Sequence, residues 1–371
     1  MGFNVEVIDL DLQGFFGYKY IFNPAIVRND DGSFLLICRL QDHLAEGYLG
    51  IGLLDNKFNP LQATTIVRYS PSMMGAANVM LEDPRAFVHE GKIYLYHVES
   101  GSSFYYFCYT VFGMMNKDGF IEGQVILDYK KNRKAFNALK SLGLSNEKKT
   151  LPQKDWLVDK NWQFFIRDDK YYSIYQAGQK NEVFRFDFPS GAIREKYVSY
   201  NNLQWNYGRI SGGAPPVLHG DGDYYSFFHS WSEWKDPNDS RPWLQRKYHI
   251  GVYVFENAPP FSIRKIASSP IFSGSDTGEL AEWGHSVVFP GSALFDHNTR
   301  EWIIALGWND QQSKVIRFSH EEVTKALVPV TNLSFLFILK KELNPYLRLI
   351  KKAVGKIYRS VKTAITSINN N

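Results

Sequence analysis

Cysteine is scarce in this chain, whose 371 residues include only Cys38 and Cys108. Both lie inside apolar runs, so they cannot form the disulfide framework of a small secreted domain. No Cys/His spacing typical of a metal site occurs either. We therefore expect a reducing compartment, no bound metal and no cofactor.

Long apolar runs are also missing. No stretch of about 18 apolar residues occurs, so no transmembrane helix is predicted. The N-terminus, residues 1–6, lacks the basic region and apolar core of a signal peptide. The net charge is only +4 and no basic stripe occurs outside the C-terminal tail, which argues against nucleic acid as a partner. These absences favour a cytoplasmic protein.

Aromatic residues, in contrast, are abundant. They make up 16% of the chain, with 9 Trp, 22 Tyr and 27 Phe, and such residues are enriched in strands. Aromatic rings also stack on sugars, but a β-rich core accounts for most of them. The composition therefore favours an all-β fold.

A sequence unit recurs five times. Each copy opens with a polar or proline-containing motif, continues as an apolar strand, turns at Asp or Gly, and follows with an aromatic strand. The copies open at Asn23, Asp83, Lys160, Gly212 and Val287. Five units, each with about four strands, predict a five-bladed β-propeller. The first strand of each blade would line a central channel, so the five opening motifs would meet at one end of it.

Two stretches interrupt these repeats. Residues 128–156 are polar and lysine-rich, and we expect an inserted loop and helix there. Residues 231–247 are rich in Trp, Arg and Asp, and we expect a long loop of the kind that is usually functional or disordered. The predicted catalytic domain spans residues 1–330.

The tail, residues 331–371, differs in kind. Apolar positions recur at helical spacing from Tyr346 to Ile365, and lysines and arginines fall mostly on other faces. A basic amphipathic helix is typical of segments that bind anionic membrane surfaces. We therefore predict a C-terminal amphipathic helix whose residues 345–368 contact the inner membrane face. A helix docked on the propeller and a dimerisation helix are the alternatives.

The second opening motif, Glu82-Asp83-Pro84-Arg85, is the best candidate for chemistry. A proline biases the residue before it toward extended geometry, so Asp83 is expected to be extended. An acid on a stiff backbone beside a cation suits proton transfer to a polar substrate. The alternatives are a surface turn with an Asp–Arg pair and, for Arg85, an ion pair with Glu82.

Taken together, the five motifs resemble glycoside hydrolase family 130, a group of β-mannoside phosphorylases, hydrolases and transferases on a five-bladed propeller. The matching segments are Asn23-Pro24 with Arg39, Glu82 to Arg85, Lys160-Asn161-Trp162, Gly212 to Val217, and Val287 to Pro290. The resemblance covers about residues 20–320 and leaves the tail uncovered.

The resemblance implies that Asp83 is the general acid of an inverting reaction at an anomeric carbon, with the proton passing through a substrate hydroxyl. The residues expected to bind substrate are Asn23, Arg39, Arg85, Lys160, Asn161, Arg209, Gly213, His229 and His285. Trp162 and Trp308 would stack on a sugar or belong to the core. Inverting hydrolysis needs a second carboxylate about 6.5–9.5 Å away. Asp276, Glu282 and Asp310 are equal candidates for it.

One position departs from the family pattern. The phosphorylases carry a His-Arg pair that helps to hold phosphate, and this chain has Tyr175-Gln176 there. Losing a cation removes a charge-assisted hydrogen bond worth about 1.5–3 kcal/mol. The departure argues against phosphorolysis and favours water or a sugar hydroxyl as the acceptor.

The sequence thus predicts an enzyme that acts on β-mannoside-like bonds of an oligosaccharide or glycoside, with phosphate or a sugar nucleotide as further ligands. Two alternatives stay open. One is a membrane-associated glycosyltransferase of the same fold in cell-surface glycan synthesis. The other is a propeller that binds glycans without catalysis, against which the intact Asp83 and Arg85 argue.

Overall fold

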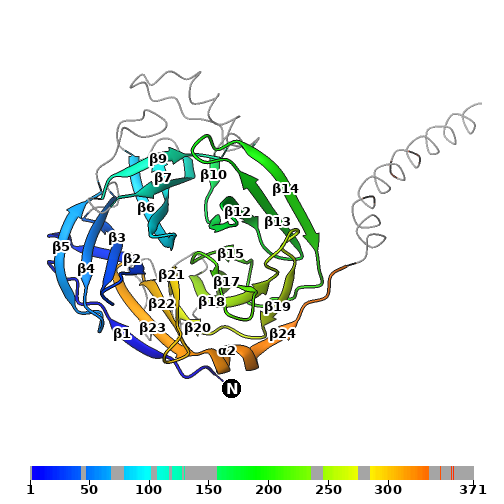
Figure 1. Ribbon diagram of the computed structural model, residues 1–371. Helices are drawn as coiled ribbons and strands as arrows, with labels where there is room; N and C mark the ends of the chain where they lie inside the picture. Colours follow the sequence, from blue (N-terminus) through cyan, green and yellow to red (C-terminus); the bar gives the residue numbers. More distant parts are fainter. Residues whose placement is uncertain are drawn as a thin grey trace, which may run out of the picture.

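The computed structural model is a ring of five β-sheets, or blades, arranged around a common axis (Figure 1). The structure describes residues 2–42, 47–67, 79–101, 107–116, 119–127, 129, 157–234, 245–274 and 285–333, together with Leu343, Lys352 and Val354. The predicted five-bladed propeller is therefore confirmed.

Each blade begins on its inner strand and steps outward. Blade 1 consists of β2 (Tyr20–Arg28), β3 (Phe34–Gln41), β4 (Tyr48–Leu54) and β5 (Pro60–Ile66). Blade 2 consists of β6 (Val79–His89), β7 (Lys92–Gly101) and β8 (Phe107–Met115), flanked by β9 (Ile121–Val125) and the parallel β10 (Leu157–Asp159). Blade 3 consists of β11 (Gln163–Arg167), β12 (Lys170–Gln176), β13 (Lys180–Phe186) and β14 (Ile193–Tyr200).

The last two blades follow the same plan. Blade 4 has a divided inner strand, β15 (Ser211–Gly212) and β16 (Val217–Leu218), followed by β17 (Tyr224–Trp234), β18 (Gln245–Phe255), β19 (Ile263–Ala267) and β20 (Phe272–Ser273). Blade 5 consists of β21 (Val288–Asp296), β22 (Glu301–Trp308) and β23 (Gln312–Ser319).

Two further strands, one before the first blade and one after the last, pair with the outer edges of blades 5 and 4. Strand β1 (Glu6–Asp9) pairs with β23, which gives blade 5 its fourth strand from the N-terminus. After β23, the short helix α2 (His320–Ala326) leads into β24 (Leu327–Pro329), which pairs with β19 of blade 4. The pairing of β1 with β23 spans nearly the length of the chain and therefore leaves no local signal in the sequence.

The apolar core is divided among the blade interfaces. Five buried clusters occur, and each joins residues of two adjacent blades. In blade 1, for example, Leu36 packs toward blade 5 and Ile37 toward blade 2. Since a strand inside a propeller is covered on both faces, its sequence is nearly continuously apolar. The same packing accounts for Trp162 and Trp308, which are buried.

The inner strands are kinked near the site. Strand β6 has a bulge between Glu82 and Arg85, and β2 has one between Phe22 and Ala25. Within these bulges Asp83 has φ +52° and Asn23 has φ +49°. The prediction that Asp83 is extended is therefore wrong, since the bulge requires the left-handed region. Asn and Asp tolerate this region better than most residues, although it costs of order 1–3 kcal/mol.

The loop predicted over residues 231–247 is wrong at both ends. Strand β17 continues to Trp234 and β18 starts at Gln245, with Trp231 opposite Tyr248 and Trp234 opposite Gln245. Exposed polar side chains such as Glu233 and Arg246 obscured the strand pattern in the sequence. Residues 235–244 lie outside the described chain.

Two other predictions concern segments that lie largely outside the described residues. In the insertion at 128–156, only Tyr129 is described, and it packs against Tyr175. In the tail beyond residue 333, only Leu343, Lys352 and Val354 are described; they are helical and exposed. The membrane contact through residues 345–368 stays a prediction. Among the described helices, none has the length and apolar character needed to cross a membrane.

Blade closure can be tested at Gly291, where an added Cβ would lie 2.1 Å from the carbonyl oxygen of Pro24 in blade 1. The atoms nearest to the added Cβ belong to the backbone of Pro24 and Ala25 and cannot move aside as a side chain could. We therefore expect Gly291→Ala to lower the free energy of unfolding by about 1–3 kcal/mol in denaturant titrations. Gly220→Ala is the control, because nothing lies within 4 Å of its added Cβ. It should change stability by less than about 0.5 kcal/mol. Equal stability of both variants would contradict the close approach.

Candidate active site

Six predicted site residues meet where the inner strands of blades 1, 2 and 3 adjoin. They are Asn23 on β2, Arg39 on β3, Asp83 and Arg85 on β6, and Lys160 and Asn161 between β10 and β11. The parallel pairing of β10 with β8 brings Lys160 beside the blade 2 carboxylates before the chain enters blade 3. The structure therefore assembles the predicted acid with its predicted cations.

The Asp83 carboxylate is buried and is contacted from both neighbouring blades. Its Oδ1 accepts a hydrogen bond of 2.8 Å from Nδ2 of Asn23 and lies 3.8 Å from a guanidinium nitrogen of Arg39. Its Oδ2 lies 4.0 Å from Nζ of Lys160. The carboxylate is thus held in one orientation by side chains of blades 1 and 3.

These contacts set the charge of Asp83. Burial raises the pKa of its carboxyl group, but the positive charges of Lys160, Arg39 and Arg85 and the hydrogen bond from Asn23 outweigh burial, so the pKa lies below its ordinary value. Burial in turn lowers the pKa of Lys160, but Asp83 and Glu82 raise it further. In the free site Asp83 is therefore ionised and Lys160 is charged.

Glu82 shares the same cations. Its Oε2 lies 3.6 Å from Arg39 and 3.9 Å from Lys160, and its Oε1 accepts a hydrogen bond of 2.6 Å from Ser100. Asp83 and Arg85 are buried, so the surface turn is wrong. Among the described residues no ion pair joins Arg85 to Glu82, because Arg39 and Lys160 bridge the two carboxylates instead.

Arg85 is fully buried and has mainly neutral partners. It donates to Oδ1 of Asn161 at 2.9 Å and to the Asp83 carbonyl oxygen at 3.4 Å, and it lies over the Phe289 ring at 4.6 Å. Among the described residues, no carboxylate oxygen lies within 4.0 Å of its guanidinium group, and its Nε has no hydrogen-bond partner. A buried charge without a close counter-ion is costly. The site therefore offers a cation to an anionic ligand.

His229 faces the same space from blade 4. Its buried ring packs against Phe289 at 5.0 Å and is stacked on Tyr248 at 6.0 Å. Burial, helped by the charge of Arg85, lowers the pKa of His229 to about 3, so the ring is neutral at physiological pH. Its Nδ1 has no partner in the described structure. His229 can thus offer a hydrogen bond but not a charge.

Of the three candidates for a second carboxylate, Asp310 is the one that lies within the described residues. Glu282 and Asp276 lie outside the described residues, whereas Asp310 follows β22 and faces the charges of Arg39, Asp83, Lys160 and Glu82. Burial, reinforced by Asp83 and Glu82, raises the pKa of Asp310 to about 6. The site therefore holds two carboxyl groups whose pKa values are pushed apart, a feature of acid–base catalytic sites.

The remaining predicted residues lie at the edges of this site. Arg209 is exposed and lines a cavity of about 60 Å³ with Lys160, Asn161 and Gln176. Gly213 is buried, and an added Cβ would lie 2.6 Å from both the Phe227 carbonyl oxygen and Pro290. Nδ1 of His285 accepts a hydrogen bond of 3.1 Å from the Arg246 backbone. Gly213 therefore packs blade 4 against blade 5, and His285 fixes the start of β18.

Sequence reasoning missed Tyr248. It stacks on His229 and faces the charges of Asp310, Arg246 and Lys160. In the sequence it was one of 22 tyrosines, and the expected loop hid the strand alternation that directs it toward the site. The alternation of β18, once recognised, is the signal that could have found it.

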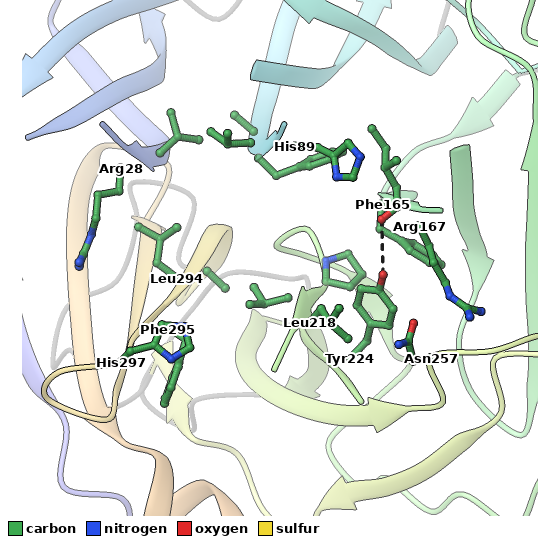
Figure 2. Close-up of a pocket in the computed structure, with 18 of the residues that line it drawn as sticks. Arg28, His89, Phe165, Arg167, Leu218, Tyr224, Asn257, Leu294, Phe295 and His297 are labelled. Atoms are coloured by element: carbon green, nitrogen blue, oxygen red, sulfur yellow. Dashed lines mark hydrogen bonds between the residues drawn. The ribbon is translucent and has the colours of Figure 1, made fainter. Parts of the chain in front are cut away.

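A larger cavity, of about 720 Å³, lies at the opposite ends of the inner strands (Figure 2). Arg28 and Arg167, which line it, are paired with Asp296 at 2.8 Å and with Asp168 at 3.3 Å. Beside it, His89, Glu90 and Asp169 place possible metal-ligand atoms within 4.8 Å of one another. Exposed groups of this kind are common without an ion, and this cavity lacks the buried carboxyl groups of the site around Asp83.

The comparisons with known proteins concern the fold. No protein-family model matches the chain, and no curated protein matches it by sequence. The structure is similar to the β-1,2-mannobiose phosphorylase from Listeria innocua in complex with β-1,2-mannobiose, with TM-score 0.57 and 12% identity over 86% of this chain and 99% of that one. The chain shares the five-bladed propeller fold of that protein.

Two proteins from Leishmania mexicana share this fold. One is a mannose phosphorylase in complex with a phosphate ion, with TM-score 0.55 and 12% identity over 89% of this chain and 92% of that one. The other is a GDP-Man-dependent mannosyltransferase, with TM-score 0.52 and 12% identity over 89% of this chain and 94% of that one. The shared fold thus occurs in both a phosphorylase and a transferase, and does not by itself determine the activity.

The raised pKa of Asp310 has a consequence for stability. Between pH 3.8, the ordinary pKa of an aspartate, and about pH 6, the folded state binds more protons than the unfolded state. The stabilising contribution of Asp310 is therefore complete below pH 3.8 and is lost as pH rises through 6. We expect Asp310→Asn to be more stable than the wild type above pH 7, by roughly 1–3 kcal/mol, and equally stable near pH 4. Denaturant titrations over this pH range measure the difference.

Asp296→Asn is the control of opposite sign. The hydrogen bond from Arg28 lowers the pKa of Asp296 below its ordinary value of 3.8. The ionised Asp296 therefore stabilises the fold above pH 3.8, and this stabilisation is lost as the pH falls below that value. This variant should be less stable than the wild type at pH 7. If Asp310→Asn is destabilised at pH 7 in the same way, the raised pKa of Asp310 is wrong.

Proposed function

We propose that this protein is a carbohydrate-active enzyme that acts on a β-mannoside-like glycosidic bond by an inverting mechanism, with Asp83 as the general acid. One observation carries the proposal. The Asp83 carboxylate is buried, oriented by Asn23 at 2.8 Å, and has Arg39 and Lys160 within 4.0 Å. A fixed acid beside cations suits a reaction that protonates a sugar oxygen while binding a polar or anionic group.

The protonation of Asp83 follows from ligand binding. In the free site, three cations keep its pKa low against the effect of burial. A sugar whose oxygens bind Arg39 and Lys160 would draw their charges away from Asp83 and exclude water, so that burial would dominate and raise the pKa of Asp83. Asp83 would then bind a proton when the reacting partners are present and pass it to the leaving oxygen, directly or through a substrate hydroxyl.

Asp310 is the proposed base when water is the acceptor. Its pKa of about 6 lies near neutrality, where a base is most effective. In an inverting hydrolysis it would take a proton from the water that attacks the anomeric carbon. Tyr175-Gln176 supports a water or sugar acceptor, because neither side chain supplies a cation to hold phosphate.

The neighbours suggest the substrate class. Their names include β-1,2-mannobiose, phosphate and GDP-Man as bound or used compounds. We infer that Arg85 and Asn161 bind the sugar or its anionic partner together with Asn23, Arg39 and Lys160. Arg209, Gly213, His229 and His285 would complete the walls of the site.

Transfer from a sugar nucleotide is the second candidate function. Arg85 is buried without a carboxylate within 4.0 Å among the described residues, and Arg39 and Lys160 lie on the same site. A buried guanidinium group without a close counter-ion, beside two further cations, suits a diphosphate leaving group. In this reaction Asp83 would accept a proton from the sugar hydroxyl that attacks.

The role of Asp83 is tested by Asp83→Asn. Asn23 and Asn161 adopt φ of +49° and +69°, so asparagine can adopt the left-handed geometry of position 83. We expect the fold to persist and turnover to fall by about 10²–10⁴-fold.

Turnover is measured with β-1,2-mannobiose, with and without phosphate, and with GDP-mannose plus mannose. Asp168→Asn is the control, since Asp168 also has positive φ, +48°, but lines the opposite cavity. Unchanged turnover in Asp83→Asn would contradict the assignment.

The acceptor is tested separately. We expect wild-type turnover of β-1,2-mannobiose to proceed in phosphate-free buffer and to release mannose alone, because Tyr175-Gln176 leaves phosphate without a cation at that place. Chromatography of the products measures this. Mannose 1-phosphate formed in proportion to added phosphate would contradict it. If Arg209→Gln then abolished that product, Arg209 would be the replacement cation in the 60 Å³ cavity.

A further inference from the structure

The hairpin of β17 and β18 is long and extends past the site. Each strand has 11 residues, and the pairing continues from Tyr224 opposite Phe255 to Trp234 opposite Gln245. Side chains alternate between the faces of a strand. His229, Trp231 and Glu233 therefore share one face of β17, and Trp234 lies on the other.

The face that carries His229 is the face directed at the candidate active site. The His229 ring contacts Phe289 on the inner strand of blade 5 and lies in the field of Arg85, Asp83 and Lys160. Trp231 is two residues farther along the same face, which is about 6–7 Å from His229. This face thus continues the wall of the site outward.

The partner strand completes this wall. Tyr248 lies opposite Trp231 and stacks on His229 with an interplanar angle of 18°. The Arg246 guanidinium lies over the Trp231 ring at 4.4 Å from its centroid. Trp231 and Tyr248 are half-buried and Arg246 is exposed. Two aromatic rings and a cation therefore form one continuous surface, which we name the hairpin wall (Trp231, Arg246 and Tyr248).

The other side of the hairpin is braced by the segment that enters blade 4. Nε1 of Trp205 donates to Oγ of Ser230 at 2.8 Å, and Tyr207 packs against His249 at 5.4 Å. Gly208 approaches so closely that an added Cβ would lie 1.9 Å from the Trp231 carbonyl oxygen. The backbone of Trp231 is therefore fixed before a ligand arrives, which reduces the entropy cost of binding.

We propose that the hairpin wall binds the sugar adjacent to the one in the catalytic centre, so that the protein recognises a disaccharide or a longer glycan. An aromatic ring stacks on the apolar face of a pyranose, while the guanidinium group and the phenol supply hydrogen bonds for its hydroxyls. This assignment rests on the proposed function, since it takes the site around Asp83 as the position of the first sugar.

The test uses titration calorimetry with mannose and with a panel of neutral disaccharides that includes β-1,2-mannobiose, all in the Asp83→Asn protein to prevent turnover. Adding Trp231→Ala should weaken disaccharide binding by about three- to tenfold and leave mannose binding unchanged. Trp234→Ala is the matched control, because Trp234 is 36% exposed on the opposite face of the same hairpin. It should change neither affinity.

The outcomes separate the two proposals. An equal loss of mannose and disaccharide binding in Trp231→Ala, or no loss of either, overturns the role of the hairpin wall. Failure of every disaccharide in the panel to bind overturns the hairpin wall together with the substrate class. In a further outcome, disaccharide binding depends on Trp231 while the wild-type protein shows no turnover of any substrate. That result supports the hairpin wall and overturns only the catalytic proposal.

Discussion

The organisation of the site depends on one charge cluster, in which the carboxylates of Glu82 and Asp83 share the cations of Arg39 and Lys160. The cluster joins β3 of blade 1, β6 of blade 2 and the segment that enters blade 3. Asp83 is buried, Arg39 and Glu82 are half-buried and Lys160 is exposed, and the Asp83 carboxylate would be costly to bury without these cations. Together they fix the orientation of Asp83 and keep its pKa low until a ligand alters the balance. The chemistry proposed for the protein follows from that balance.

The propeller supplies the rigidity that this cluster needs. Adjacent blades pack against one another through five apolar clusters of described residues, and β1 and β24 pair with the outer edges of blades 5 and 4. The scaffold can therefore retain features that cost stability, including the left-handed backbone at Asp83 and the unpartnered Nε of Arg85. Strained backbone of this kind is common at functional sites. Asn23, Asp83 and Asn161, which all have positive φ, lie together where blades 1 to 3 adjoin.

Much of this arrangement could be predicted from the sequence, because the propeller repeats a local pattern. The five opening motifs gave the number of blades and brought Asn23, Asp83 and Lys160 to one place. Details set by contacts distant in sequence could not be predicted. The left-handed Asp83 depends on a bulge against β7, and the raised pKa of Asp310 depends on its burial and on the carboxylates of Asp83 and Glu82 in blade 2. Polar residues on an exposed hairpin disguised β17 and β18 as a loop, so Tyr248 was missed.

The proposed chemistry requires the first sugar to bind over Asp83 rather than in the larger cavity at the opposite ends of the inner strands. A crystal structure of the Asp83→Asn protein soaked with β-1,2-mannobiose distinguishes the two positions. We expect a sugar ring whose glycosidic oxygen, or a hydroxyl beside it, lies within about 3.2 Å of the residue 83 side chain. A disaccharide bound only between Arg28, His89 and Arg167, with the space around residue 83 empty, would contradict it.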